Sequence, residues 1–241
     1  MKFTIKCIVN SATNMEIYHV FFEYLSYWFP RATKISFLNL VTPIFKIILI
    51  LNGGCFMKIF ISGGCKNGKS YFAQKIAKIQ NKKKLYYVAT MNPSDSEDLQ
   101  RIQKHRQERD GWGFETIEQP KNISNALLSL DSESSILLDS LTALLANEMF
   151  SKNEIKLDAA SKICNEIKLV CSKINNIVFV SDYIYSDAFL YDALTEDYRK
   201  SLSQIDRTAA KCCDVVIEVV YGNIVFHKGA KEFESIYGKI C

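Results

Sequence analysis

The sequence predicts an α/β fold with a mostly parallel β-sheet flanked by helices in three layers. Three observations lead to this prediction. A glycine-rich loop at residues 63–70 lies between a short apolar segment and a helical pattern. Strand-like and helix-like segments alternate after it, which is typical of a parallel sheet wrapped by helices. A chain of 241 residues, 48% of them hydrophobic, is also long enough to bury one large core.

The loop reads Gly63-Gly64-Cys65-Lys66-Asn67-Gly68-Lys69-Ser70 and completes the pattern G-x-x-x-x-G-K-[ST]. A strand over 58–62 precedes it, and a helix over 71–80 follows it. Backbone N–H groups of such a loop surround phosphate oxygens, Lys69 would reach the terminal phosphates, and Ser70 would hold Mg²⁺. A glycine-rich turn can match by chance, but the flanking strand and helix favour a P-loop NTPase-like fold that binds a nucleotide.

The remaining elements follow from hydrophobic patterning. Strands are expected at 85–89, 136–138, 177–181, 215–220 and 224–227. Helices are expected at 99–109, 124–130, 141–150, 155–174 and 196–212. Residues 92–98 and 183–194 read as loops, and the second is rich in Tyr and Asp. Loops at the ends of parallel strands commonly carry function.

Asp139 ends the apolar segment 136–138. A phosphate-loop enzyme places the aspartate that organises magnesium at such a strand end. The alternative is a cap for the helix that starts near Ser140. With the phosphate loop present, the magnesium role is favoured, shared between Asp139 and Ser70.

The segment 101–109 reads Arg-Ile-Gln-Lys-His-Arg-Gln-Glu-Arg. Arg101, His105 and Arg109 recur every four residues and therefore share one face of a helix. Guanidinium groups bind phosphoryl oxygens in pairs, and a neutral imidazole nitrogen can attack phosphorus. Taken alone, however, this pattern favours a solvated basic helix.

The first 56 residues differ in composition from the rest. They are aromatic-rich over 18–29 and apolar over 37–51, with Pro30 and Pro43 interrupting. Charged residues break the pattern of a signal peptide, and no stretch reaches the length of a membrane span. We therefore expect residues 1–56 to be a non-native or poorly ordered extension without stable membrane insertion. A P-loop nucleotide-binding catalytic domain would then span 57–241, with Met57 as its natural start.

Charge and cysteine content exclude some functions. The chain has 30 Lys and Arg against 26 Asp and Glu; the extension holds five and two of these, which leaves 25 against 24 in 57–241. This balance argues against a nucleic-acid-binding surface. Eight cysteines without paired metal-ligand spacing predict neither zinc nor a disulfide framework, and indicate a reducing, cytoplasmic location.

From Met57 onward the chain resembles the bifunctional adenosylcobinamide kinase/adenosylcobinamide-phosphate guanylyltransferase family of cobalamin biosynthesis. The motifs occur in the order typical of that family. They are the glycine-rich loop, the strand end Tyr87-Val88-Ala89-Thr90, the Arg-Ile-x-x-His-x-x-x-Arg helix at 101–109, Trp112, Thr116, Glu118-Gln119-Pro120 and Leu138-Asp139-Ser140-Leu141-Thr142.

The resemblance implies a function and a set of site residues. The enzyme would phosphorylate adenosylcobinamide, a corrinoid, and then transfer GMP from GTP to the product through a guanylylated His105, giving adenosyl-GDP-cobinamide. It implies GTP and ATP as substrates, Mg²⁺ and a homotrimer. Besides the loop residues with Lys69, the nucleotide-binding candidates are Tyr71, Ala89, Thr90, Met91, Arg101, Arg106, Gln107, Glu108, Arg109, Glu118 and Asp139.

The C-terminal third departs from the family pattern. Relatives commonly read Ser/Thr-Asn-Glu-Val-Gly where this chain has Ser181-Asp182-Tyr183-Ile184-Tyr185, and a later Asn is replaced near Asp206. The departure concerns the corrinoid end of the site. Two alternatives stay open: a small-molecule kinase of another pathway without a covalent histidine, and a nucleotide-sensing module without turnover.

Overall fold

The computed structural model describes residues 56–81, 83–93, 96–151, 154–185 and 187–237. The chain divides into two units, Met1–Gly53 and Gly54–Cys241. Except for Phe56, the expected extension at 1–56 lies outside the described residues, so the account below concerns the second unit.

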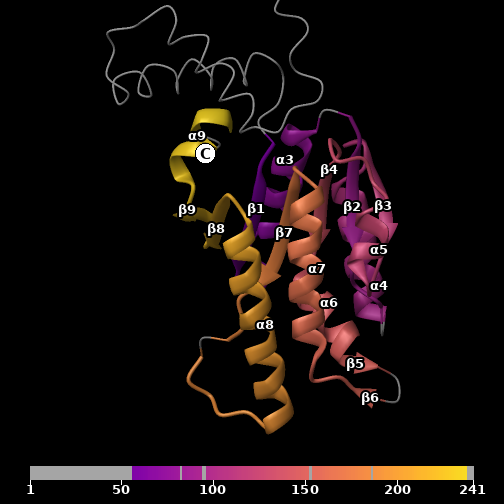
Figure 1. Ribbon diagram of the computed structural model, residues 1–241, viewed down its shortest axis with the longest axis vertical. Coiled ribbons are helices and arrows are strands. Elements are labelled where there is room, and N and C mark those ends of the chain that lie inside the picture. The colour runs from indigo at the N-terminus through magenta and orange to yellow at the C-terminus, as the bar shows by residue number, and fades with distance from the viewer. Residues whose placement is uncertain (1–55, 82, 94–95, 152–153, 186, 238–241) are drawn as a thin grey trace, which may run out of the picture. The chain divides into compact units, whose positions relative to one another are not determined.

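A seven-stranded sheet organises this unit (Figure 1). Its strands are β1 (Lys58–Gly63), β2 (Leu85–Ala89), β3 (Phe114–Glu118), β4 (Ser135–Asp139), β7 (Ile177–Asp182), β8 (Val215–Val220) and β9 (Asn223–Lys228). In space they run β3-β2-β4-β7-β1-β8-β9. Within this sheet, neighbouring strands are parallel except for β9, which pairs antiparallel to β8. The predicted mostly parallel α/β sheet is thus confirmed.

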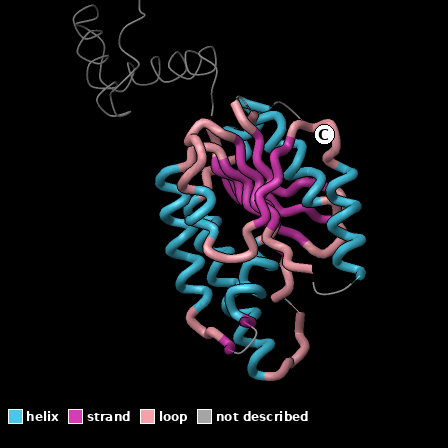
Figure 2. Tube along the Cα trace, turned by 90° about the vertical axis from the view of Figure 1, so that its right-hand side faces the viewer, coloured by secondary structure: helices cyan, strands magenta, loops and turns pink. Residues whose placement is uncertain are grey.

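Helices connect the strands and cover both faces of the sheet (Figure 2). They are α3 (Lys69–Gln80), α4 (Ser96–Glu108), α5 (Ile123–Leu127), α6 (Leu141–Met149), α7 (Ala159–Lys173), α8 (Ala193–Cys212) and α9 (Ala230–Tyr237). A small antiparallel pair, β5 (Phe150–Ser151) with β6 (Glu154–Ile155), lies between α6 and α7. In the part of the chain that the structure describes, no helix is long and apolar enough to cross a membrane.

The sheet separates two apolar clusters. Successive side chains of a strand point to opposite faces, and β7 shows this directly. Ile177 and Phe179 join the cluster formed with α5, α6, α7 and α8, whereas Val178 and Val180 join the cluster formed with α3 and α9. Strands buried on both faces need continuous apolar runs. These runs are why the central strands could be recognised in the sequence.

Differences from the predicted elements occur mainly at the edges. The strand β3 was not predicted, because it is an edge strand in which Glu115, Thr116 and Glu118 are exposed. The helix α9 was also missed; Phe233 is its only residue buried in the core. The helix predicted from 155 begins at Ala159, since residues 154–155 pair with β5 instead.

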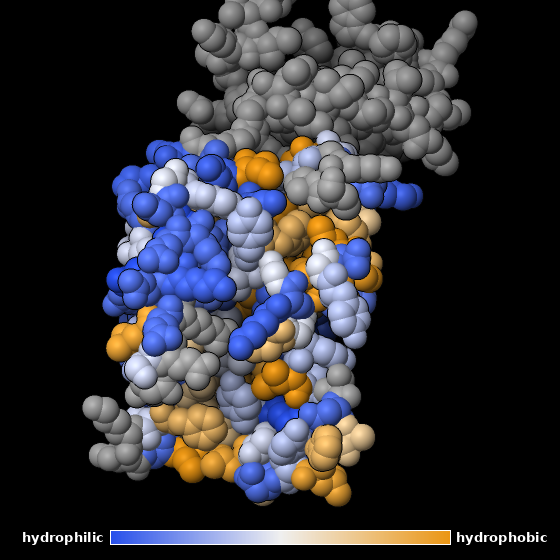
Figure 3. Space-filling model, turned by 180° about the vertical axis from the view of Figure 1, so that it is seen from behind, coloured by the Kyte–Doolittle hydropathy of each residue, from blue (hydrophilic) through white to orange (hydrophobic). Residues whose placement is uncertain are grey.

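The face of the molecule opposite to that in Figure 1 carries both hydrophilic and hydrophobic side chains (Figure 3). Hydrophilic residues cover a broad part of this face, and apolar patches interrupt them (Figure 3). Elsewhere, the segment between β7 and α8 exposes several large apolar and aromatic side chains, of which Phe189 and Leu190 are the most exposed.

Candidate functional site

The phosphate loop begins where β1 ends, at Gly63, and leads into α3 at Lys69. Two of its glycines are required by local geometry. Gly68 has a φ of +89°, a left-handed conformation that other residues rarely adopt. A Cβ at Gly63 would collide with the Asn67 side chain and with the carbonyl oxygen of Val219. The sequence therefore folds tightly here, with Asn67 donating a hydrogen bond to that same carbonyl.

Lys69 is held by a carboxylate. Its Nζ lies 2.5 Å from Oδ1 of Asp182 and donates to the carbonyl oxygen of Gly64 at 3.2 Å. The two charged side chains are only 7% and 16% exposed. Water therefore screens this ion pair weakly, and each charge depends on the other for compensation.

The backbone at Asp182 is fixed by three elements. In the sheet register, Asp182 at the end of β7 pairs with Gly63 at the end of β1. The backbone N–H of Asp182 donates to Thr142 Oγ1 of α6 at 2.8 Å. Tyr198 of α8 donates its hydroxyl to the carbonyl oxygen of Thr142 at 3.0 Å. Burial, with Asp182 and Asp206 acting in the same direction, raises the pKa of Tyr198 to about 12, so this donor stays protonated at neutral pH.

Asp139 ends β4, as predicted. Its Oδ2 accepts a hydrogen bond from the Tyr87 hydroxyl at 2.9 Å. The following residue, Ser140, caps α6 by accepting from the backbone N–H of Ala143. The predicted alternative, a helix cap, thus falls to Ser140, and the Asp139 side chain faces the cavity described below.

Thr90 is fully buried. Its hydroxyl accepts from the Ser140 backbone N–H and donates to the Ser140 carbonyl oxygen, each at 2.7 Å. Its own carbonyl accepts from the Asn147 side chain at 2.6 Å. This predicted nucleotide-binding residue therefore joins the ends of β2 and β4.

The helix α4 brings His105 to the site. The ring Nδ1 of His105 lies 3.2 Å from Oε2 of Glu108, one turn later. A carboxylate can only accept at this contact, so Nδ1 carries a hydrogen, and in the neutral ring the lone pair then lies on Nε2. Arg101 lies in the same helix, but its side chain is outside the part that the structure describes.

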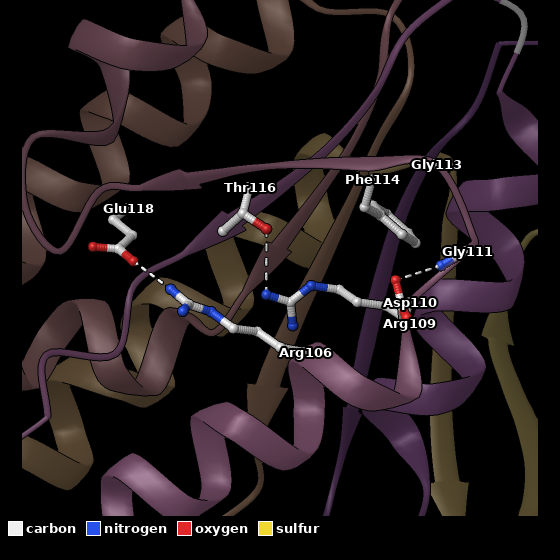
Figure 4. A pocket seen from close by; sticks show the side chains of 8 residues that line it. All are labelled: Arg106, Arg109, Asp110, Gly111, Gly113, Phe114, Thr116 and Glu118. Carbon is white, nitrogen blue, oxygen red and sulfur yellow. Dashed lines mark hydrogen bonds and ion pairs between the residues drawn. The ribbon is translucent and has the colours of Figure 1, made fainter.

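Two arginines reach from the end of α4 to β3 (Figure 4). Arg106 donates to Glu118 Oε1 at 2.7 Å, and Arg109 donates to Thr116 Oγ1 at 3.3 Å. The Arg109 guanidinium also lies over the Tyr87 ring, 4.0 Å from its centre. Burial lowers the pKa of Arg109 from its usual value, while Tyr87 and Asp139 act in the opposite direction. It remains a cation, since a guanidinium is not deprotonated in proteins.

A cavity of about 830 Å³ connects most of these groups. Its lining includes Ser70, Ala89, Met91, His105, Arg106, Arg109, Glu118, Asp139 and Asp182. Toward α6 the wall combines Ala143, Ala146, Phe150 and Tyr198 with the polar residues Ser140, Thr142 and Asn147. A more open pocket of about 640 Å³ shares Arg106, Arg109, Thr116 and Glu118 with it (Figure 4).

Several predicted residues do not line either space. Tyr71 is half-exposed and contacts Trp112, with ring centres 5.8 Å apart. Gln107 and Glu108 are likewise absent from both linings, although Glu108 touches His105. In the loop, Ser70 is the member that reaches the larger cavity.

Sequence reasoning missed four contributors: Tyr87, Thr142, Tyr198 and Asp182. The first three act through hydrogen bonds across the fold, which no local pattern indicates. Asp182 had a usable signal, because it follows an apolar strand as Asp139 does. It was noted only as a departure from the family pattern.

The residues present fit a magnesium ion. Ser70 and Asp139 both line the larger cavity and offer hard oxygen donors. Mg²⁺ is commonly held by one or two protein oxygens, with waters and substrate phosphates completing its shell. Among the described residues no group of three or more His, Cys, Asp and Glu side chains is placed to hold a metal. A site that uses nucleotide phosphates needs no such group.

Comparison with known proteins identifies the family. Residues 59–226 match the profile of the cobinamide kinase / cobinamide phosphate guanyltransferase family. No curated protein matches the chain.

Among solved structures, the chain is similar to flagellar accessory protein FlaH from Methanocaldococcus jannaschii, at 17% identity and a TM-score of 0.41, over 76% of this chain and 84% of that one. It is also similar to the VirB11 ATPase of the Brucella suis type IV secretion system, at 12% identity and a TM-score of 0.37, over 93% of this chain and 57% of that one. The family match spans well over half of the sequence. The chain therefore belongs to the cobinamide kinase/cobinamide phosphate guanyltransferase family, whose enzymes process cobinamide in cobalamin biosynthesis.

Proposed function

We propose that this chain phosphorylates adenosylcobinamide and then transfers GMP from GTP to the phosphorylated product through a guanylylated His105. The observation that carries the proposal is that one cavity is lined by Ser70, Asp139 and His105. A metal-binding pair next to a phosphate loop supports phosphoryl transfer. An oriented imidazole in the same cavity supports covalent nucleotidyl transfer.

In the phosphorylation step, the acceptor hydroxyl oxygen attacks the terminal phosphorus of a nucleoside triphosphate, and the diphosphate leaves. Lys69 would neutralise the terminal phosphates, while loop N–H groups would hold them. Mg²⁺ bound by Ser70 and Asp139 would supply further charge neutralisation. ATP and GTP are both proposed as substrates of the enzyme.

In the GMP-transfer steps, the Nε2 lone pair of His105 attacks the α-phosphorus of GTP, and pyrophosphate leaves. A phosphate oxygen of adenosylcobinamide phosphate then attacks the same phosphorus and releases the imidazole. Glu108 would accept a hydrogen bond from Nδ1–H and stabilise the positive charge that the ring gains. Arg106 and Arg109 would offset the charge on the phosphates, as preorganised cations do in such sites.

Labelling tests the covalent step. Incubation with GTP labelled at the α-phosphate should leave a protein-bound label that survives alkali and is lost in mild acid, as for a phosphoramidate. The His105→Ala variant should not be labelled, yet it should keep much of the phosphorylation activity. His227→Ala is the matched control, because His227 lies on the edge strand β9, where it contacts Glu218.

The same assay separates the alternatives. A wild-type enzyme that turns over without any label would point to a kinase that does not use a covalent histidine. A protein that consumes no triphosphate in the presence of adenosylcobinamide would point to a nucleotide sensor. A His105→Ala variant that transfers GMP normally would contradict the proposed mechanism.

A further inference from the structure

The ion pair between Lys69 and Asp182 places a carboxylate beside the phosphate-binding position. The lysine of a phosphate loop reaches the terminal phosphates of its nucleotide. Asp182 Oδ1 lies 2.5 Å from the Nζ of that lysine, and Asp182 lines the same cavity as Ser70 and Asp139. An acceptor that approaches the terminal phosphate through this cavity must therefore pass close to the Asp182 carboxylate.

From this placement we propose that Asp182 is the general base of the phosphorylation step. Its carboxylate would accept the proton of the acceptor hydroxyl as the hydroxyl oxygen bonds to phosphorus. The inference rests on the proposed function and names a catalytic residue for one of its two half-reactions.

The step balances without any further reactant. The O–H bond of the acceptor breaks, and its proton goes to a carboxylate oxygen of Asp182. The oxygen forms a bond to the terminal phosphorus, while the bond from this phosphorus to the bridging oxygen breaks, and the nucleoside diphosphate leaves. Asp182 later returns the proton to water.

Nucleotide binding would release the Asp182 carboxylate from its ion pair with Lys69. In the nucleotide-free protein, Lys69 neutralises Asp182. A triphosphate carries several negative charges and competes for the same ammonium group. As Lys69 turns to the phosphates, the Asp182 carboxylate is left facing the cavity, while the lysine stays near enough to limit repulsion between carboxylate and phosphate.

The position of Asp182 is also rigid enough for this role. Its backbone is held by the pairing of β7 with β1 and by the hydrogen bond to Thr142. A proton acceptor must lie within hydrogen-bond reach of the group that it deprotonates. Fixed backbone on both sides limits the carboxylate to side-chain rotation.

The other carboxylates near the cavity already have partners of their own. Asp139 accepts from Tyr87 and belongs to the proposed magnesium pair. Glu118 is paired with Arg106 at 2.7 Å. Asp206 is 2% exposed, bonded to Tyr185, and does not line the cavity. Asp182 alone among these four combines contact with Lys69 and access to the cavity.

The chemistry of the two half-reactions makes a selective test. Only the hydroxyl acceptor must lose a proton; the imidazole of His105 and the phosphate of adenosylcobinamide phosphate attack through lone pairs that are already free. Asp182→Asn keeps the size and shape of the side chain but removes its basicity. It should lower kcat of phosphorylation by about 10²-fold or more. With GTP bound, the phosphates compensate Lys69 in place of Asp182. At saturating GTP, kcat of GMP transfer to supplied adenosylcobinamide phosphate should therefore fall far less than kcat of phosphorylation, and His105 should still be labelled.

Asp187→Asn is the matched control. This aspartate follows the same strand, pairs with Arg199 at 2.9 Å, and does not line the cavity. It should leave both half-reactions close to wild type. Asp182→Glu keeps a carboxylate with a different reach and should retain more phosphorylation activity than Asp182→Asn. Labelling of His105 in each preparation shows that the variant is folded.

The outcomes are distinct. Equal losses of both half-reactions in Asp182→Asn would mean that Asp182 only positions Lys69, and would overturn the proposal. Unchanged phosphorylation in Asp182→Asn would overturn it as well. If Asp182→Asn cannot be labelled, nucleotide affinity decides: loss of binding gives Asp182 a structural role and overturns the proposal. A wild-type enzyme that performs neither reaction would instead refute the proposed function.

Discussion

Lys69 is the residue on which both proposed half-reactions depend. One phosphate cradle would serve the donor nucleotides of phosphorylation and of GMP transfer. Lys69→Ala should lower both rates by about 10²–10³-fold, because a preorganised cation at the transferring or leaving phosphates is lost. Separate assays of the two half-reactions measure this, with thermal unfolding as the control for folding. A wild-type rate in either assay would reveal a second nucleotide site.

Asp206 gives stability a pH dependence. Burial raises the pKa of Asp206 from 3.8 to about 7, against the hydrogen bonds from Ser181 and Tyr185, and the neighbouring charge of Asp182 adds to the rise. Between about pH 4 and pH 7 the folded protein therefore holds a proton that the unfolded chain releases. The stability that this group contributes is complete below about pH 4 and is lost as pH rises through about 7.

Replacing this carboxyl tests that assignment. Asp206→Asn should flatten the fall in unfolding free energy between about pH 4 and pH 7 by a few kcal/mol at most. Urea unfolding at the two pH values measures the change. Asp158→Asn is the control, since Asp158 is exposed at the start of α7 and makes no side-chain capping bond. A variant with the same pH dependence as wild type would place the titration elsewhere.

Among the elements, the segment between β7 and α8 is fastened by one arginine. Arg199 of α8 is only 8% exposed. It donates to Glu196 at 2.5 Å, to Asp187 at 2.9 Å and to the carbonyl oxygen of Ile184 at 3.3 Å, and its guanidinium lies 4.8 Å from the centre of the Tyr191 ring. A planar fork of donors is needed to reach these partners together.

Arg199→Lys should therefore loosen this segment. A lysine keeps the charge but cannot make all three hydrogen bonds, so amide exchange over 187–192 should accelerate about tenfold or more. Exchange in β7 should not change. Arg207→Lys makes the same replacement at an exposed position of α8 and should have no effect. Equal exchange in wild type and Arg199→Lys would show that other contacts hold the segment.

Some of these helices and strands could be predicted from the sequence, and others could not. The strand β1, the loop and α3 were predictable because a chemical motif and two hydrophobic patterns coincide there. The central strands β4 and β7 were predictable because both of their faces are buried. The edge strand β3 has little apolar content, and it forms a strand because it pairs with β2. Phe114 pairs with Leu85, which lies 29 positions earlier in the sequence. No local pattern encodes that pairing.

The candidate site was likewise predictable where local sequence patterns indicate it, and not where it depends on contacts between distant segments. His105, Arg106, Arg109 and Asp139 were predicted and line one cavity. Thr90 was predicted as a nucleotide contact, but its buried hydrogen bonds to Ser140 depend on two strands meeting in space. A role for Asp182 in the site becomes apparent only from its ion pair with Lys69, which lies 113 positions away in the sequence. Contacts of this kind become visible when the sheet is assembled.

For the whole molecule, we expect residues 57–241 to fold and act without the preceding segment. All seven strands of the main sheet lie between Lys58 and Lys228, and Met57 is already part of the buried core. The 57–241 form should match the full chain in both half-reactions. It should also sediment as the homotrimer that is proposed for this enzyme. An insoluble or inactive 57–241 form, beside an active full chain, would contradict this expectation.

The neutral pairing of Lys69 with Asp182 has a consequence for competition inside a cell. Inorganic phosphate is a small anion that could occupy an empty phosphate loop and inhibit the enzyme. To do so, it would have to displace a carboxylate that already lies 2.5 Å from the lysine. A triphosphate compensates for that displacement with many more contacts to the loop and to magnesium, whereas free phosphate has few. We therefore expect the Asp182 carboxylate to compete for Lys69 more effectively with free phosphate than with a nucleoside triphosphate.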